Sequence, residues 1–199
     1  ILSAELGNVN AAASTGFDTT GGNTTFSGNL ATAFGARSIA KTGPNTLLLD
    51  GQSTNTTTFS IAGGLVQAGS AQTGSTSGPL GLGSIVFAGG ALQYSAANQT
   101  DYSPRFTADT QVYAADTNGQ DVTWSRAFTL GTNGGISKSG AGTLTLSGGS
   151  VTMGTSGLAA SGGTLAVSAT TLTSTTGALL DVTGGGRIEI GGVNRIGTA

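Results

Sequence analysis

Cysteine and histidine are absent from this 199-residue chain, and charged residues are few. Without cysteine there is neither a disulfide framework nor a thiolate metal site. Without histidine the chain lacks the commonest general base and the commonest metal ligand. Seven basic and nine acidic residues give a net charge of −2, with no basic stripe of the kind that binds nucleic acid. No apolar run approaches the roughly 20 residues of a membrane-spanning helix, so we expect neither a nucleic-acid partner nor membrane insertion.

Glycine, by contrast, is abundant, and apolar residues are spread regularly along the chain. There are 36 Gly, and the hydrophobic fraction is 37%. Disordered chains combine low hydrophobicity with high net charge, and this chain has neither property. No long segment has helical periodicity, and each Gly would cost a helix about 1 kcal/mol relative to Ala. The composition therefore favours short strands in a repetitive architecture.

The sequence contains a long internal repeat. Residues 39–51 and 136–148 share the pattern I-x-K-[ST]-G-x-x-T-L-x-L-x-G at an offset of 97 positions. Upstream, Asp18 matches Asp116 at an offset of 98, and downstream Gly63-Gly64 matches Gly162-Gly163 at an offset of 99. We interpret the chain as an N-terminal segment, 1–16, that is a cap or a linker, a first long repeat, 17–115, and a second, partial repeat, 116–199.

A shorter period of 22 to 26 residues lies inside the long repeat. Gly-Gly followed by alternating apolar residues recurs at 63–67, 89–94, 162–167 and 185–190. Each copy is typical of a turn followed by a short strand.

Together these periods predict an all-β fold, a right-handed parallel β-helix of about nine coils. In such a solenoid each strand pairs with its equivalent one coil away, and like side chains stack inside. The predicted interior residues are Leu47, Leu49, Leu65, Leu92, Leu144, Leu146, Leu165 and Ile188. A β-sandwich or Greek-key domain is the alternative all-β fold.

The repeat motifs resemble those of a known family. Residues 136–148 are similar to the autotransporter-associated β-strand repeat, also called the passenger-associated transport repeat, as are 79–87 and 162–167. Residues 92–106 resemble recurrent phrases of the same large bacterial proteins, so the likeness covers about 17–190. It implies a parallel β-helix exported as the passenger of an autotransporter-type protein, serving adhesion, aggregation or biofilm scaffolding. Pro44-Asn45 departs from the usual Ala-Gly, and we expect an altered corner there.

The densest group of carboxylates is a candidate for chemistry on glycans. It consists of Asp101, Asp109, Asp116 and Asp121. Glycan-cleaving enzymes use a pair of carboxylates about 5 to 9 Å apart. The alternative is that these residues form turns, which Asp and Asn favour, and the match of Asp116 with Asp18 favours a corner role.

Residues 116–121 also resemble a calcium loop, with Asp116, Asn118 and Asp121 as the oxygen ligands. The loop lacks the terminal Glu, and an ordinary turn is the alternative. We expect no cofactor, no bound metal and no catalytic residue.

Aromatic residues gather in one third of the chain, at Tyr94, Tyr102, Phe106, Tyr113, Trp124 and Phe128. They either fill the core or form a sugar-stacking platform. In the second case Tyr102, Arg105, Asp101 and Asp109 are the candidate ligand-binding residues, with Arg105 stacking on Phe106 or pairing with Asp101 or Asp109. Lys41 and Lys138 occupy equivalent repeat positions, where we expect ion pairs between coils.

These observations favour a non-enzymatic module with a structural or adhesive role, located outside the cell or on a bacterial cell surface. Its expected partners are further β-helix coils of the same chain or protein, stacked end to end. One alternative is a subunit that assembles into an extracellular filament through its open ends. Another is a β-helix that binds or cleaves a surface polysaccharide.

Overall fold

The protein is all-β, and every pairing between its named strands is parallel. The structure, a computed structural model, describes residues 15–30, 38–174, 177–191 and 195–198. The strands are two to five residues long, and the described part also contains one short 3-10 helix, η2 (Ser103–Arg105). Of the predicted N-terminal segment 1–16, only residues 15 and 16 lie within the described residues.

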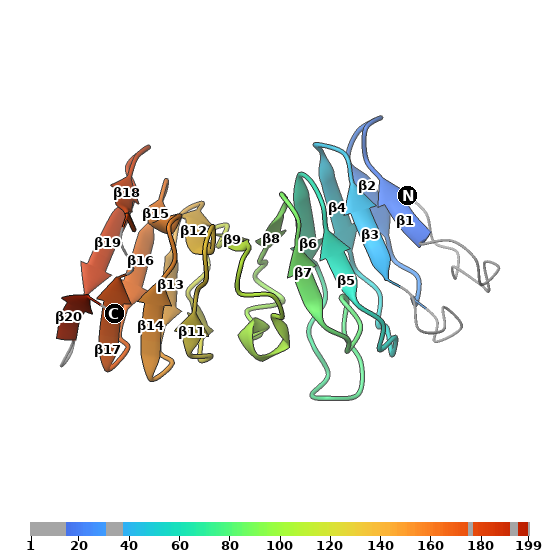
Figure 1. Cartoon of the computed structure of the whole chain (residues 1–199). Coiled ribbons are helices and arrows are strands. Elements are labelled where there is room, and N and C mark those ends of the chain that lie inside the picture. The colour runs from blue at the N-terminus through green and yellow to red at the C-terminus, as the bar shows by residue number, and fades with distance from the viewer. Residues whose placement is uncertain (1–14, 31–37, 175–176, 192–194, 199) are drawn as a thin grey trace. The chain divides into compact units, whose positions relative to one another are not determined.

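The chain divides into two compact units (Figure 1). Unit 1 contains residues 1–98 and 105–107. Its strands form two parallel stacks, β1-β3-β5-β7 and β2-β4-β6-β8. The strands are β1 (Thr15–Asp18), β2 (Thr24–Phe26), β3 (Ile39–Thr42), β4 (Thr46–Leu49), β5 (Phe59–Ile61), β6 (Leu65–Ala68), β7 (Ile85–Phe87) and β8 (Ala91–Gln93).

Unit 2 contains residues 99–104 and 108–199, and its strands form three parallel stacks. These are β9-β12-β15-β18, β10-β13-β16-β19 and β11-β14-β17-β20. The strands are β9 (Val112–Asp116), β10 (Val122–Trp124), β11 (Phe128–Thr129), β12 (Gly135–Ser139), β13 (Thr143–Leu146), β14 (Ser150–Met153), β15 (Gly157–Ala160), β16 (Thr164–Val167), β17 (Thr171–Ser174), β18 (Leu180–Val182), β19 (Arg187–Ile190) and β20 (Arg195–Thr198).

Stacked strands place like side chains in columns inside each unit. In unit 2, Val122, Leu144 and Leu165 are register partners in successive layers, and each is at most 2% exposed. Thr123 and Thr145 alternate with them and face outward. Because side chains alternate across a strand, each short apolar–polar alternation in the sequence produces one buried and one solvated face. The predicted parallel β-helix is therefore confirmed.

Two details of the prediction are wrong. In the described part of the chain the strands make about seven turns instead of about nine. Leu65 also points outward, and Val66 is the buried residue that pairs with Leu47 and Leu92. After Gly63-Gly64, Gly89-Gly90 and Gly162-Gly163 the second residue is the buried one, so position, and not only hydrophobicity, decides the face.

A third strand stack forms in unit 2 because of the local sequence. There, 150–153 and 171–174 read SVTM and TLTS, with apolar residues at alternate positions. The corresponding stretch of unit 1, 52–56, reads QSTNT and offers no apolar face to bury. It is irregular, and its Asn55 carboxamide oxygen accepts a hydrogen bond from Thr57 N instead (2.6 Å).

The aromatic residues belong to the core. All six are at most 3% exposed: Tyr94, Tyr102, Phe106, Tyr113, Trp124 and Phe128. The interpretation of a filled core is confirmed, and these rings form no exposed platform for sugars. Within the described ranges no helix has the length and hydropathy needed to cross a membrane.

Candidate functional site

Two lysines lie inside the β-helix, one in each unit. Lys41 and Lys138 are both 0% exposed. Each follows a buried isoleucine by two positions, Ile39 in β3 and Ile136 in β12. The alternation of the strand therefore directs the lysine inward, with its apolar stem along the core.

The ammonium group of Lys138 is surrounded by oxygens from three successive layers. Its Nζ lies 2.7 Å from Thr117 Oγ1, 3.0 Å from Ser139 O, 2.7 Å from Gly140 O and 2.9 Å from Gly162 O. Thr117 follows β9, Ser139 and Gly140 follow β12, and Gly162 precedes β16. One side chain thus joins the same corner of three layers.

Lys41 makes a similar arrangement in unit 1, with oxygens from its own layer and the next one. Its Nζ donates to Gly43 O (2.8 Å), Asn45 O (2.5 Å) and Gly63 O (2.6 Å), which matches the three donors of an ammonium group. Gly43 and Gly63 correspond in the repeat to the two glycines around Lys138. We call each buried lysine with its surrounding backbone oxygens a lysine corner.

The two lysine corners differ where the sequences differ. Gly142 has φ +85°, whereas Asn45, its counterpart, is not among the residues with positive φ. Asn45 instead donates its side-chain amide to Thr19 O (2.7 Å). The expected change of this corner is confirmed: Lys41 donates to Asn45 O, whereas Lys138 contacts Thr117 Oγ1 of the preceding layer.

Carbonyl dipoles, and not carboxylates, solvate these buried charges. Neither lysine takes part in the ion pairs Arg126–Asp109 and Arg187–Glu189 of the described residues, so the expected lysine ion pairs are wrong. Burial lowers the pKa of Lys138, although the charges of Asp116 and Asp121 oppose the shift. Burial likewise lowers the pKa of Lys41. Buried ammonium groups are tolerated only when every donor has an acceptor, and the lysine corners meet this condition.

Removing the two carboxylates near Lys138 is expected to lower its pKa further. Asp116→Asn combined with Asp121→Asn takes away the charges that favour the ammonium form. NMR titration of the Lys138 side chain measures the change, with Asp50→Asn in unit 1 as the control. Because the pKa of folded Lys138 lies below its usual 10.5, the unfolded chain binds more protons between the two values, and stability rises with pH there. A pKa that rises in the double variant would contradict this account.

The candidate calcium loop forms a corner of the solenoid. Asp116 Oδ1 accepts a hydrogen bond from Asn118 N, and Asp121 Oδ1 accepts one from Thr143 N in the next layer (both 2.9 Å). Among the described residues no group of three or more acidic, histidine or cysteine side chains could hold a metal ion.

The first repeat shows that the carboxylate of Asp121 is replaceable. In unit 1, Asn23 Oδ1 accepts a hydrogen bond from Thr46 N at the same 2.9 Å. Asn23 corresponds to Asp121, and Thr46 corresponds to Thr143. A neutral amide thus makes the same bond between layers, so these oxygens are used to join coils.

Asp101 also joins two segments. Its Oδ1 accepts hydrogen bonds from Ser103 N (2.9 Å) and Ser103 Oγ (2.6 Å), and its Oδ2 accepts bonds from Ser125 N (2.9 Å) and Ser125 Oγ (2.5 Å). Both carboxylate oxygens are therefore engaged within unit 2.

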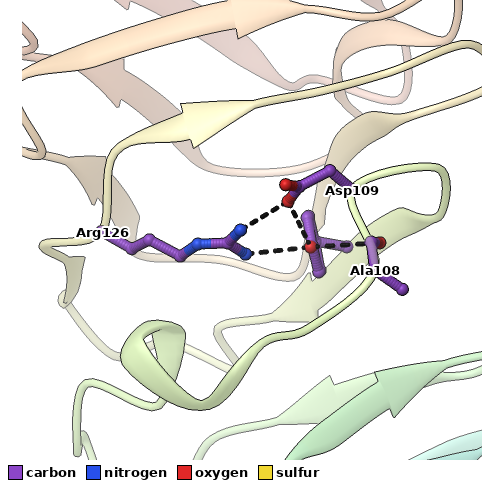
Figure 2. A network of polar contacts seen from close by, with 4 residues as sticks. Ala108, Asp109 and Arg126 are labelled. Atoms are coloured by element: carbon purple, nitrogen blue, oxygen red, sulfur yellow. Dashed lines mark hydrogen bonds and ion pairs between the residues drawn. The ribbon is translucent and has the colours of Figure 1, made fainter.

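Asp109 belongs to a polar network with Arg126 and Tyr113 (Figure 2). Arg126 Nη2 lies 2.5 Å from Asp109 Oδ1, and the Tyr113 hydroxyl accepts a hydrogen bond from Arg126 Nη1 (3.0 Å). The guanidinium also lies over the rings of Tyr113 and Phe128, 5.7 and 5.4 Å from their centroids. Ala108, at the turn, has φ +94° and its carbonyl lies 3.2 Å from the Tyr113 hydroxyl.

Burial and the contacts within this network shift the pKa values of Tyr113 and Arg126. Burial raises the pKa of Tyr113, and the hydrogen bonds and charges of Tyr113 and Asp109 raise the pKa of Arg126 against the effect of burial. Asp109 and Arg126 remain partly exposed, at 37% and 22% of their side chains. Of the four candidate carboxylates, Asp109 is the one that accepts a hydrogen bond from the hydroxyl of the buried Tyr113 (3.0 Å).

The candidate ligand-binding residues Tyr102 and Arg105 are engaged within the protein. Tyr102 lies in the core, and Arg105 binds backbone carbonyls. Tyr102 is 0% exposed. In unit 1, Arg105 donates from Nε to Gly83 O (2.7 Å) and from Nη2 to Leu80 O (3.1 Å). The structure thus gives Arg126, and not Arg105, as the ion-pair partner of Asp109.

No family model, no curated protein and no solved structure matches the chain. The resemblance to the autotransporter-associated repeat stays a prediction.

Sequence reasoning missed two features of these sites. The interior position of the lysines was readable, because I-x-K places Lys on the same strand face as Ile. The pairing of Arg126 with Asp109 had no local signal, since the residues are 17 positions apart and meet through a turn between layers.

Proposed function

We propose that this chain is a non-enzymatic structural module of a bacterial secreted or cell-surface protein, acting as a stalk or adhesive scaffold. One observation carries the proposal: three of the charged side chains considered for chemistry bind the backbone of neighbouring coils. Lys41, Lys138 and Asp121 each connect residues of successive layers. Groups that are buried or saturated in this way are poorly suited to meet a substrate.

Composition and repeat structure support the extracellular part of the proposal. The chain has no cysteine, and among the described residues no group of acidic side chains could hold a metal ion. Its coils are joined by hydrogen bonds and by columns of apolar side chains. Repeats of this kind add stability through contacts between neighbouring coils, so length can be increased without a new core. The sequence resemblance to autotransporter passengers favours the same location and an adhesive or biofilm role.

Turnover and adhesion assays together test the proposal. We expect no product from a broad panel of polysaccharides with the intact chain, and no difference between it and Asp109→Asn. Beads coated with the intact chain should attach to bacterial surfaces better than beads coated with the heat-denatured chain. Cleavage of any glycan that is lost in Asp109→Asn would contradict the proposal.

A further inference from the structure

The apolar columns of unit 2 accept more than one pairing of β13 with β16. The inward residues are Leu144 and Leu146 in β13 and Leu165 and Val167 in β16, all 0% exposed. Ala169, two positions beyond Val167, is 1% exposed. A slide of β16 by two residues would bring Val167 opposite Leu144. It would also bring Ala169 opposite Leu146, so the interior would remain apolar. Side-chain alternation has a period of two and therefore does not distinguish these registers.

The outward face of the same strands does not fix the register either. Thr145 lies opposite Ala166 in the observed pairing, and after the slide it would lie opposite Ser168. All three are small side chains at half-buried or exposed positions. Cross-strand pairs of this kind differ little in energy. The observed register therefore depends on a contact outside the apolar and threonine columns.

The lysine corner of unit 2 supplies a contact that depends on register. Lys138 Nζ lies 2.7 Å from Gly140 O, in the turn before β13, and 2.9 Å from Gly162 O, in the turn before β16. Because each strand residue rises about 3.3 Å, a slide of two residues moves Gly162 O by about 6.6 Å. Thr164 O, which would take its place, belongs to the β16 ladder and points toward a neighbouring strand. The buried ammonium group would then lose an acceptor, which costs far more than a changed apolar contact.

Lys138 also marks one layer of its own column. Its register partners are Ala115 in β9 and Ala160 in β15, each 1% exposed. These two small side chains leave room for the long apolar stem between them. In the layer before, Thr117 Oγ1 lies 2.7 Å from Nζ. The ammonium group is therefore satisfied when this layer lies between these two neighbours in this register.

We propose that the lysine corner of unit 2 selects the register in which the coils stack, by excluding slipped pairings that the apolar columns alone accept. Buried polar groups specify structure in this way when one arrangement satisfies them and the alternatives do not. This role is separate from the stability that the corner contributes, because it concerns the difference between two folded arrangements. Lys41 gives unit 1 the same dependence, since its Nζ donates to Gly63 O in the turn before β6 (2.6 Å).

Cysteine pairs report the register, because the chain has no cysteine of its own. Thr145→Cys with Ala166→Cys places two thiols opposite each other in the observed register, with Cα atoms about 4.8 Å apart. Thr145→Cys with Ser168→Cys brings the thiols together only after the slide. In the observed register these Cα atoms are about 8 Å apart, which is too far for a disulfide. Mass spectrometry measures the fraction of chains that form each disulfide after refolding in a glutathione redox buffer.

In the parent chain the first cysteine pair should form its disulfide and the second should not. With Lys138→Met the second pair should form its disulfide at least about tenfold more often, because an uncharged side chain no longer penalises the slipped register. The matched control is Leu172→Ala in β17, which removes buried apolar contacts and leaves the lysine corner intact. The two variants are compared at urea concentrations that give equal free energies of unfolding, and Trp124 emission shows that unit 2 is folded.

Two results would overturn the proposal. Equal formation of the second disulfide in Lys138→Met and Leu172→Ala would show that lost stability, and not the lost charge, permits the slide. Formation of the first disulfide alone in Lys138→Met would show that another contact fixes the register. If Lys138→Met does not refold, Thr117→Val removes one oxygen from the corner and should give a smaller rise, and an unchanged slipped fraction there counts equally against the proposal. None of these outcomes depends on adhesion or glycan turnover, so they are independent of the proposed function.

Discussion

Replacing Lys138 by Met is expected to lower the free energy of unfolding of unit 2 by about 2–4 kcal/mol. Methionine keeps much of the apolar stem but removes every donor of the ammonium group. Gly140 O and Gly162 O, at 2.7 and 2.9 Å from Nζ, would lose this buried partner. An unsatisfied buried acceptor costs about 1–3 kcal/mol, and the three layers would lose a shared contact.

Urea unfolding followed by tryptophan emission measures this effect directly. Trp124 is the only tryptophan, is 0% exposed and lies in unit 2 beside Phe128. The matched control is Arg187→Met, which removes an exposed charge and one surface ion pair and should cost less than about 0.5 kcal/mol. Equal stabilities of Lys138→Met and the parent chain would show that the lysine corner is not stabilising.

Lys41→Met provides an independent repetition in unit 1. Its Nζ donates to three carbonyls at 2.5 to 2.8 Å, so a loss of similar size is expected. Because unit 1 contains no tryptophan, far-UV circular dichroism is the measurement there.

Replacing Gly163 by Ala is expected to destabilise unit 2 by about 2–5 kcal/mol. Gly163 has φ +57°, a left-handed conformation that favours glycine. A Cβ at this position would clash first with Gly142 O, and it would also lie only 2.8 Å from both Gly140 O and Lys138 Nζ, inside the lysine corner. Strain in the backbone and a clash with the clustered oxygens therefore act together.

Gly119→Ala separates the two causes. Gly119 also has positive φ, +83°, but a Cβ there would meet nothing within 4 Å. It should cost only about 1–2 kcal/mol, the strain alone. Gly163→Ala combined with Lys138→Met should cost less than the sum of the single changes, because the clash with Nζ disappears. Equal costs for Gly119→Ala and Gly163→Ala would show that crowding at the corner has no effect.

Local patterns predicted most of the fold because a β-helix is built from local rules. A Gly-Gly turn followed by period-2 alternation states where a strand begins and which positions alternate. Such a pattern predicted the buried positions of Leu47, Leu92, Leu144 and Leu165 correctly. It failed at Leu65, where two adjacent apolar residues left the face undecided and stacking on Leu47 selected Val66.

The candidate site was less predictable because its contacts cross between layers. Lys138 reaches Gly162, 24 positions along the chain, and Asp101 reaches Ser125, also 24 positions along. A repeat offset shows that two residues are equivalent, but it does not show which oxygens surround a charge.

By itself the sequence determined the class of fold, the coil period and the repeat equivalence of the two lysines, since these follow from glycine corners and the alternation of neighbouring side chains. The tertiary structure decided two things: that the lysines are solvated by backbone carbonyls, and that Arg126 pairs with Asp109. Each depends on which backbone groups come within about 3 Å after the coils have stacked. That is a property of the stacked layers and is not encoded within any one coil.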